Sequence, residues 1–308
     1  MGQVLLRAFS FTMIIAIGIF LRSAHIVDEH AGASVKKIMI NITLPAALIT
    51  NFSQMESVSA EFLLIVLLGL LVNVIMLAVG AAVTRGRDAS TRLVYILGLP
   101  AFNIGAFCLP FVQSFLPAVG TVTACMFDVG NSIMCTGVNY AFASAYVSGD
   151  TSGGFDLRAF FLKLVKSAPL VTYVVMFVLT LAGIRLPQTI LTLIAPAAQA
   201  NIFTAMLMLG LLFHLELKPE YLKQVGGVIG IRHLASVAFA LLFWFLLPFD
   251  RIIRQTLVLL CFGPMSAVAP AYVGMSGGDE GLESCANSLT ILCSLAEITA
   301  LIIAMGIY

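Results

Sequence analysis

The sequence has few charged residues and little hydrophilic length from which a soluble domain could form. Asp, Glu, Lys and Arg make up 10% of its 308 residues, whereas hydrophobic residues make up 60%. The mean hydropathy of +1.06 lies far above the range of soluble domains. The formal net charge of +1, without a basic run that carries interleaved aromatic residues, argues against a nucleic-acid-binding protein. This composition predicts an all-α membrane protein.

Several kinds of chemical site are missing from the sequence. It contains no phosphate-cradling loop with its lysine, so we expect no ATP hydrolysis. His25, Asp28, Glu29 and His30 lie in a connection and lack the helical spacing of zinc enzymes. The six cysteines fall inside apolar segments, where they behave as small hydrophobic residues rather than as a disulfide framework. We expect no metal site, no cofactor and no enzymatic activity.

Ten apolar segments are long enough to cross a bilayer, which takes about 20 residues each. They span residues 4–22, 35–52, 62–84, 92–111, 119–147, 160–182, 190–213, 229–247, 252–275 and 282–307. A loop rich in Gly, Ser, Thr and Asp, at residues 148–157, divides them into five and five. We expect residues 1–147 and 158–308 to form two repeats joined by this linker. Because each repeat has an odd number of spans, the second would be inverted in the membrane.

The basic residues predict the orientation of the chain. Twelve of the 16 Lys and Arg residues fall on one side of the expected spans and four on the other. Since positively charged connections stay in the cytoplasm, the 148–157 linker is expected inside and both termini outside. The first apolar stretch ends at Arg22 without a small-residue cleavage site, so we interpret it as a span rather than a signal peptide. We predict a multi-pass protein of the cell (inner) membrane.

The fourth and ninth segments are interrupted by proline and polar residues, at 103–110 and 264–270. Proline removes a backbone donor and leaves other backbone groups unpaired at membrane depth. Such backbone is tolerated only where it is buried in protein or lines a wet cavity, and a matched pair of breaks is typical of the binding site of a secondary transporter. The alternative is that Pro110 and Pro270 only kink ordinary helices.

We expect the binding site where the two interrupted helices cross. The N-termini of half-helices present free N–H groups and partial positive charge, which suits a carboxylate. Small residues let two backbones approach, and asparagine amides both donate and accept hydrogen bonds. The predicted substrate-binding residues are Asn103, Ile104, Gly105, Pro110, Ser266, Ala267, Pro270, Asn41 and Asn201.

Asp128 is the main candidate for proton or ion coupling. An ionisable group inside a span is costly to bury and is by default a functional hypothesis. Helical spacing places Asn131 on the same face, so the two side chains can act together. Glu297, in the last segment, is a similar candidate. The alternative for each carboxylate is a structural hydrogen bond to a neighbouring helix.

These motifs resemble the auxin efflux carrier family, which includes plant PIN carriers and short bacterial members. The resemblance is carried by residues 41–45, by 103–110, and by 264–270 followed by Tyr272, Gly274 and Asp279. It implies an inverted repeat related to the bile acid sodium symporter fold, with the fourth and ninth helices crossing at Pro110 and Pro270 and with Asn103 beside the substrate. It also implies a scaffold domain, a mobile transport domain, an elevator-like motion and a homodimer.

The resemblance implies a carrier of small organic anions. The central loop is short, so the long regulatory loop of plant PIN members is missing and auxin is not assumed as the substrate. Bacterial relatives are associated with acids such as malonate or malate, and H⁺ or Na⁺ are possible coupling ions. One alternative is a sodium-coupled symporter of the bile acid type.

Alternatives from other classes are a sensor, a channel and an intramembrane protease. A sensor would typically append a signalling domain. Paired breaks favour alternating access over a channel. Aspartyl proteases need two apposed carboxylates, and serine types need an intramembrane histidine, whereas His214 and His233 lie near segment ends.

Overall fold

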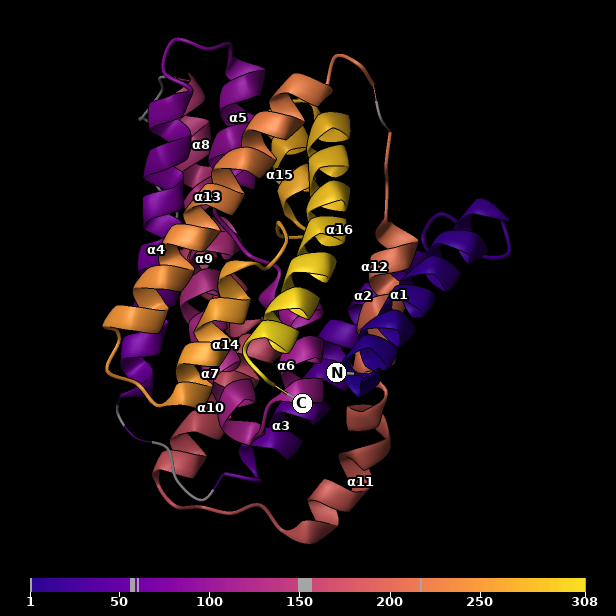
Figure 1. Cartoon of the computed structure of the whole chain (residues 1–308), viewed down its shortest axis with the longest axis vertical. Coiled ribbons are helices and arrows are strands. Elements are labelled where there is room, and N and C mark those ends of the chain that lie inside the picture. The colour runs from indigo at the N-terminus through magenta and orange to yellow at the C-terminus, as the bar shows by residue number, and fades with distance from the viewer. Residues whose placement is uncertain (1, 56–58, 60, 149–156, 217, 308) are drawn as a thin grey trace.

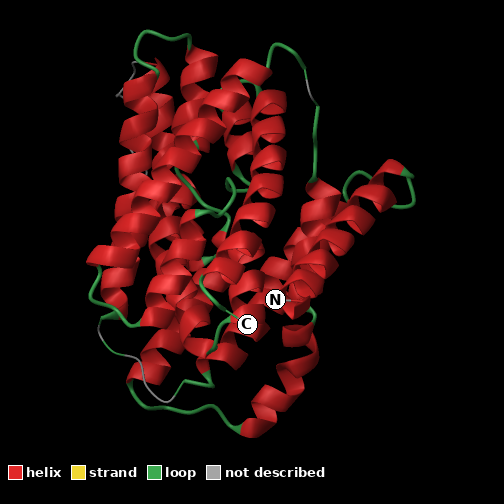
Figure 2. Cartoon of the chain, in the orientation of Figure 1, coloured by secondary structure: helices red, strands yellow, loops and turns green. Residues whose placement is uncertain are grey.

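The computed structural model describes residues 2–55, 59, 61–148, 157–216 and 218–307, and these residues are predominantly helical (Figures 1 and 2). In chain order the elements are α1 (Gly2–Ser23), α2 (Ala31–Ile38), the π-helical turn η1 (Met39–Thr43), α3 (Leu44–Phe52), α4 (Phe62–Val83), α5 (Ala89–Gly98), η2 (Ile104–Cys108), α6 (Leu109–Phe115), α7 (Ala118–Ile133), η3 (Met134–Val138), α8 (Asn139–Ser148), α9 (Leu157–Val165), α10 (Ala168–Leu181), α11 (Gln188–Gln199), α12 (Asn201–Leu212), α13 (Leu222–Leu246), α14 (Arg251–Cys261), α15 (Ala269–Met275) and α16 (Glu280–Ala304).

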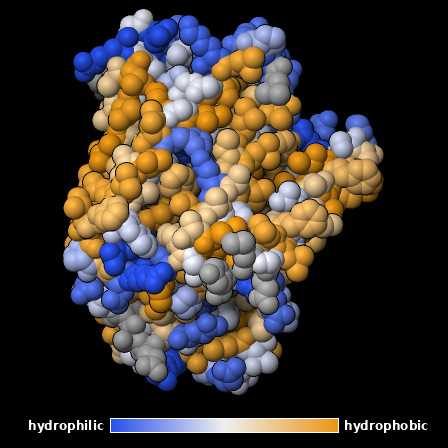
Figure 3. All heavy atoms as spheres, viewed as in Figure 1, coloured by the Kyte–Doolittle hydropathy of each residue, from blue (hydrophilic) through white to orange (hydrophobic). Residues whose placement is uncertain are grey.

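The helices fit a membrane-embedded protein. Within the described residues, six helical segments are long and apolar enough to cross a bilayer, namely Val4–Ser23, Ala31–Phe52, Phe62–Val83, Gln188–Leu212, Leu222–Leu246 and Glu280–Ala304. Apolar side chains cover most of the face seen in Figure 3, with polar residues gathered toward its two ends. Large apolar side chains such as Leu193 and Leu234 are about three-quarters exposed, at 76% and 75%, as expected for contact with lipid.

The number of spans and the repeat organisation remain predictions. Each expected segment contains helix, but the fourth and ninth consist of short helices on either side of a non-helical stretch. Residues 149–156 lie outside the described part, so the structure does not describe most of the predicted linker.

The helices form two packed groups. In the first group, α1 and α2 pack along α12, and α3 packs against α11. In the second group, α4 packs along α7, which also contacts α14, and α14 packs against α13. Glycines allow the closest approaches: a Cβ on Gly210 of α12 would overlap the Ile15 carbonyl of α1, and one on Gly130 of α7 would overlap the Val66 carbonyl of α4. Figure 1 shows α1 and α12 beside each other, and α1 also contacts α16 whereas α12 contacts η2.

The two interrupted segments meet inside the second group. Between α5 and η2 the chain is non-helical at 99–103, and between α14 and α15 it is non-helical at 262–268. Phe102 and Met265 form an isolated antiparallel bridge. The Asn103 N–H donates to the Pro264 carbonyl at 2.9 Å, and the Ser266 N–H donates to the Ala101 carbonyl at 3.0 Å. The crossing is therefore made by paired main chains.

The crossing lies at Phe102 and Met265 rather than at the expected Pro110 and Pro270. Pro270 occupies the first turn of α15, where proline is tolerated because the N–H that it lacks would have no partner within the helix. Pro110 lies at the start of α6, directly after the π-helical turn η2, where the regular hydrogen-bond ladder is already interrupted. The prolines within the two non-helical stretches are Pro100 and Pro264.

Candidate functional site

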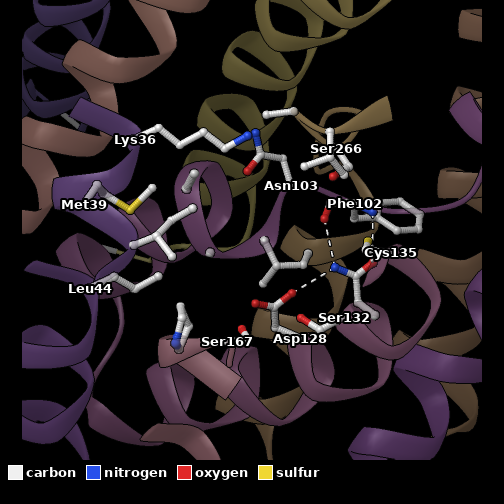
Figure 4. A pocket seen from close by; sticks show the side chains of 18 of the residues that line it. Lys36, Met39, Leu44, Phe102, Asn103, Asp128, Ser132, Cys135, Ser167 and Ser266 are labelled. Atoms are coloured by element: carbon white, nitrogen blue, oxygen red, sulfur yellow. Dashed lines mark hydrogen bonds between the residues drawn. The ribbon is translucent and has the colours of Figure 1, made fainter. Parts of the chain in front are cut away.

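A cavity of about 370 Å³ lies where the crossing faces the first helix group (Figure 4). The second group and the crossing contribute Phe102, Asn103, Ile104, Gly105, Ala106, Asp128, Asn131, Ser132, Cys135, Ser266, Ala267, Val268 and Tyr272. The opposite walls come from α2 to α3, the α9–α10 region and α12, through Lys36, Met39, Ile40, Leu44, Lys163, Ser167, Pro169 and Met208. The cavity thus lies between two bodies of helices, and seven of the predicted site residues line it.

Asn103 supplies an unpaired donor to this cavity. Its side chain is 6% exposed, and its Nδ2 has no hydrogen-bond partner among the described residues. Figure 4 shows Asn103 and Lys36 reaching into the same space from opposite walls. A buried polar group without a partner costs about 1–3 kcal/mol, so an acceptor that enters the cavity would recover this free energy.

The half-helix after Asn103 begins at the cavity. Helix runs from Ile104 to Phe115 through η2 and α6, and the first N–H groups of a helix have no partner within it. Ile104 and Gly105 line the cavity, and Gly105 has no side chain to cover the backbone. The positive end of the helix dipole on this wall and the Lys36 ammonium on the opposite wall make the cavity suitable for an anion.

Asp128 and Asn131 are next to each other, as their spacing predicts. The Asn131 Nδ2 donates to the Asp128 Oδ1 at 2.8 Å, and the Tyr173 hydroxyl donates to the Asp128 Oδ2 at 3.0 Å. Asn131 also holds the crossing: its Oδ1 accepts from the Phe102 N–H and its Nδ2 donates to the Phe102 carbonyl, both at 2.9 Å. Asp128 therefore orients the amide that holds one half of the crossing.

Side chains of α16 form hydrogen bonds with the other main chain of the crossing, the 262–268 stretch. The Asn287 Nδ2 donates to the carbonyl of Ser266 at 2.9 Å and to that of Met265 at 3.3 Å. The Thr290 hydroxyl accepts from the Met265 N–H at 3.2 Å. The main-chain N–H and carbonyl of both bridge residues are thus satisfied by side chains of a later helix, α7 for Phe102 and α16 for Met265.

Sequence reasoning missed a third side chain that holds the crossing, Arg232. We counted it among basic residues at a span end, but α13 begins at Leu222, which places Arg232 inside the helix and 3% exposed. Its Nη1 donates to the carbonyls of Gly98 and Leu99 at 3.1 and 2.5 Å, and its Nη2 donates to that of Gly263 at 2.9 Å. The guanidinium thus joins the C-terminal ends of α5 and α14, where helix dipoles favour a cation.

Glu283 of α16, also missed, lies near this guanidinium and is 0% exposed. The sequence carried one available signal for both residues, since each is an ionisable residue within an apolar segment. Lys36 and Lys163 were missed as well, because lysines near span ends are usually solvated.

Two of the predicted asparagines do not line the cavity. Asn41 is exposed on the outer face of η1, and its Nδ2 donates to the Lys37 carbonyl at 2.8 Å. Asn201 is buried at the start of α12, where its Oδ1 accepts from the Thr43 hydroxyl at 3.3 Å and its Nδ2 donates to Gln113 at 3.4 Å. Asn201 instead links α12 to neighbouring helices.

Three other predicted residues also lie away from the main cavity. Glu297 forms a 2.8 Å pair with His233 between α16 and α13, and both side chains are 29% exposed. Pro110 is buried in α6. Pro270 lines a neighbouring cavity of about 250 Å³, which shares Lys36 and Ala267 with the main one.

The described residues contain no group of three or more His, Cys, Asp or Glu side chains that could hold a metal ion. No protein-family model matches the chain, and no curated protein matches it in sequence.

Proposed function

We propose that this protein is a secondary active transporter that carries small organic anions across the cell membrane. The observation that carries the proposal is the unpaired, buried amide of Asn103 in a cavity that a lysine and a half-helix N-terminus also face. All three are donors or positive charges, and a carboxylate is an acceptor with two oxygens.

In the proposed complex, one carboxylate accepts hydrogen bonds from the Asn103 Nδ2 and from N–H groups at the start of η2, with the Lys36 ammonium nearby. Both oxygens of Asp128 already accept hydrogen bonds from other side chains. In this proposal Asp128 therefore supports the crossing, and the Asn103 amide, the N–H groups of η2 and the Lys36 ammonium bind the substrate.

Alternating access would be a movement of the second helix group relative to the first, as in an elevator. The position of the cavity between the two groups supports this proposal. An asparagine amide donates to the main-chain carbonyl of each bridge residue, Asn131 to Phe102 and Asn287 to Met265. This similarity between the two halves supports an inverted five-plus-five repeat. Membership of the auxin efflux carrier family and a homodimeric assembly are part of the same proposal.

Uptake into liposomes tests the function. Purified protein would be reconstituted and supplied with radiolabelled malonate, malate or indole-3-acetate, with and without a proton or sodium gradient. We expect saturable uptake that is stimulated by unlabelled anion on the opposite side. Absence of saturable flux for every acid would refute the carrier of small organic anions, and accumulation driven by sodium alone would favour a symporter of the bile acid type.

Two matched variants test the site. Asn103→Ala removes a hydrogen bond to a charged group, worth about 1.5–3 kcal/mol, so KM should rise about 10- to 100-fold. Asn41→Ala makes the same change on the exposed face of η1 and should leave KM unchanged. Equal KM values for Asn103→Ala and wild type would show that the anion binds elsewhere.

A further inference from the structure

Glu283 is a buried carboxyl group without a partner. It is 0% exposed, neither oxygen has a hydrogen-bond partner within the described chain, and it forms no ion pair there. Its carboxyl group packs onto Gly98, where a Cβ would lie 2.5 Å from the Glu283 Oε1 and 2.6 Å from the Met265 methyl group. An ionised carboxylate in this position would have no hydrogen-bond donor among the described residues, and burying it costs several kcal/mol, so this packing suits the neutral acid.

Glu283 and the other buried acid, Asp128, differ in the hydrogen bonds that their carboxyl groups accept. Both Asp128 oxygens accept hydrogen bonds, from Asn131 and Tyr173. Hydrogen bonds of this kind stabilise a carboxylate in its charged form. The Glu283 oxygens accept no hydrogen bond from the described residues. When Glu283 gains or loses its proton, the groups around it must therefore move.

Arg232 of α13 is the charged neighbour of Glu283, because both side chains contact Gly98: the Arg232 Nη1 donates to the Gly98 carbonyl at 3.1 Å, and the Glu283 carboxyl group packs onto the Gly98 α-carbon. The other elements around the carboxyl group present Gly98 from α5 and Met265 from the 262–268 stretch, neither of which titrates.

The guanidinium donates to carbonyls at the ends of α5 and α14, and it lies 4.6 Å from the centre of the Phe102 ring. Arginine stays protonated, so it acts here as a permanent cation at the negative ends of two half-helices.

We infer that Glu283 is the proton-binding group that couples this carrier to a proton gradient, with Arg232 as the positioning residue that transmits its charge to the crossing. When Glu283 loses its proton, the carboxylate attracts the guanidinium away from the Gly98 and Gly263 carbonyls. When it takes up a proton, the guanidinium returns to them. Proton occupancy then changes how firmly the two half-helices are held. The coupling part of this inference rests on the proposed function, whereas the proton site does not.

A cavity lies beside the neighbours of Glu283 on α16. Asn287 lies one helical turn beyond Glu283 on α16 and lines the neighbouring cavity of about 250 Å³, as does Ser284.

The carbonyls at the ends of α5 and α14 already accept hydrogen bonds from Arg232, so the crossing does not need a bound metal cation to satisfy them.

Transport measurements test the coupling. In proteoliposomes, a pH gradient should drive accumulation of the anion by wild type, and Glu283→Gln should abolish this accumulation while keeping exchange of anion for anion at equal pH. Glu297→Gln removes a carboxylate from the same helix, where it pairs with His233, and should accumulate like wild type. Accumulation by Glu283→Gln under the pH gradient, or accumulation by wild type under a sodium gradient alone, would overturn the inference.

An infrared measurement tests the proton site without transport. Difference spectra between acid and alkaline buffer should show the C=O band of a protonated carboxyl group in wild type and Glu297→Gln, and lose it in Glu283→Gln. If the last variant does not fold, Glu283→Asp should keep the band at a shifted position. An unchanged band in either Glu283 variant would refute the proton site. Loss of the band in a protein that moves no anion would leave the proton site standing and refute the carrier.

Discussion

Replacing Asn131 tests how the crossing is stabilised. Asn131→Ala removes the side chain that pairs both main-chain groups of Phe102, each at 2.9 Å. An unsatisfied buried backbone group costs about 1–3 kcal/mol, so the two groups together should lower the free energy of unfolding by about 2–6 kcal/mol. Asp128 also loses the hydrogen bond of 2.8 Å from Asn131, so the loss in free energy of unfolding should lie above the lower end of this range.

The free energy of unfolding would be measured by denaturant titration of the purified protein in bicelles. The matched control is Asn41→Ala, the same substitution at an exposed position whose Nδ2 reaches only the Lys37 carbonyl, with an expected loss below about 0.5 kcal/mol. If Asn131→Ala lost less than about 1 kcal/mol, or no more than the control, the crossing would not depend on this amide.

Two further substitutions test the surroundings of the crossing and a helix start. Gly98→Ala places a Cβ 2.5 Å from the Glu283 Oε1 and should destabilise the protein by about 1–3 kcal/mol. The expected result is a lower Tm. An unchanged Tm would mean that the carboxyl group has room to move. Asp88 caps α5, and hydrogen bonds from the Thr91 N–H and hydroxyl hold the pKa of its carboxyl below the ordinary 3.8. Its stabilising effect should therefore be present at pH 7 and be lost as the pH falls below about 3.8, so the Tm difference between wild type and Asp88→Ala should shrink on acidification; a constant difference would contradict the cap.

Helical spacing was sufficient to predict the pairing of Asp128 with Asn131, because residues three apart share a helix face whatever the tertiary structure. The two interruptions were also evident in the sequence, since proline and asparagine stand out in an apolar segment. Their positions were not. Pro270 lies in the first turn of α15 and Pro110 lies within the helix that η2 and α6 form, so neither proline by itself marks where the chain leaves the helix.

Tertiary contacts decide the position of the first break. Ala101 has a φ of 65°, which is rare for a residue other than glycine, and its N–H donates to the Asn73 Oδ1 of α4 at 2.5 Å. That partner lies 28 residues earlier in the chain. No local pattern indicates such a contact.

Asn41 and Arg232 show a second reason for the differences. A membrane helix that is apolar on most sides has no polar face that would show which side of it is buried. Asn41 was therefore placed in the site although it lies on the outer face, and Arg232 was assigned to a span end although it is buried inside α13. Asn103 was expected to hold the opened turn with its amide, whereas its Nδ2 has no hydrogen-bond partner among the described residues and lines the cavity instead.

The Phe102–Met265 bridge is built from main-chain atoms alone. Its two hydrogen bonds join Asn103 to Pro264 and Ser266 to Ala101 through groups that every residue, or every residue except proline, possesses. Side chains on the opposite walls, such as Lys36 and Met208, can therefore be exchanged while the bridge persists. If the protein is the carrier proposed above, its selectivity should be open to change through side chains of the first helix group, with the architecture of the crossing unchanged.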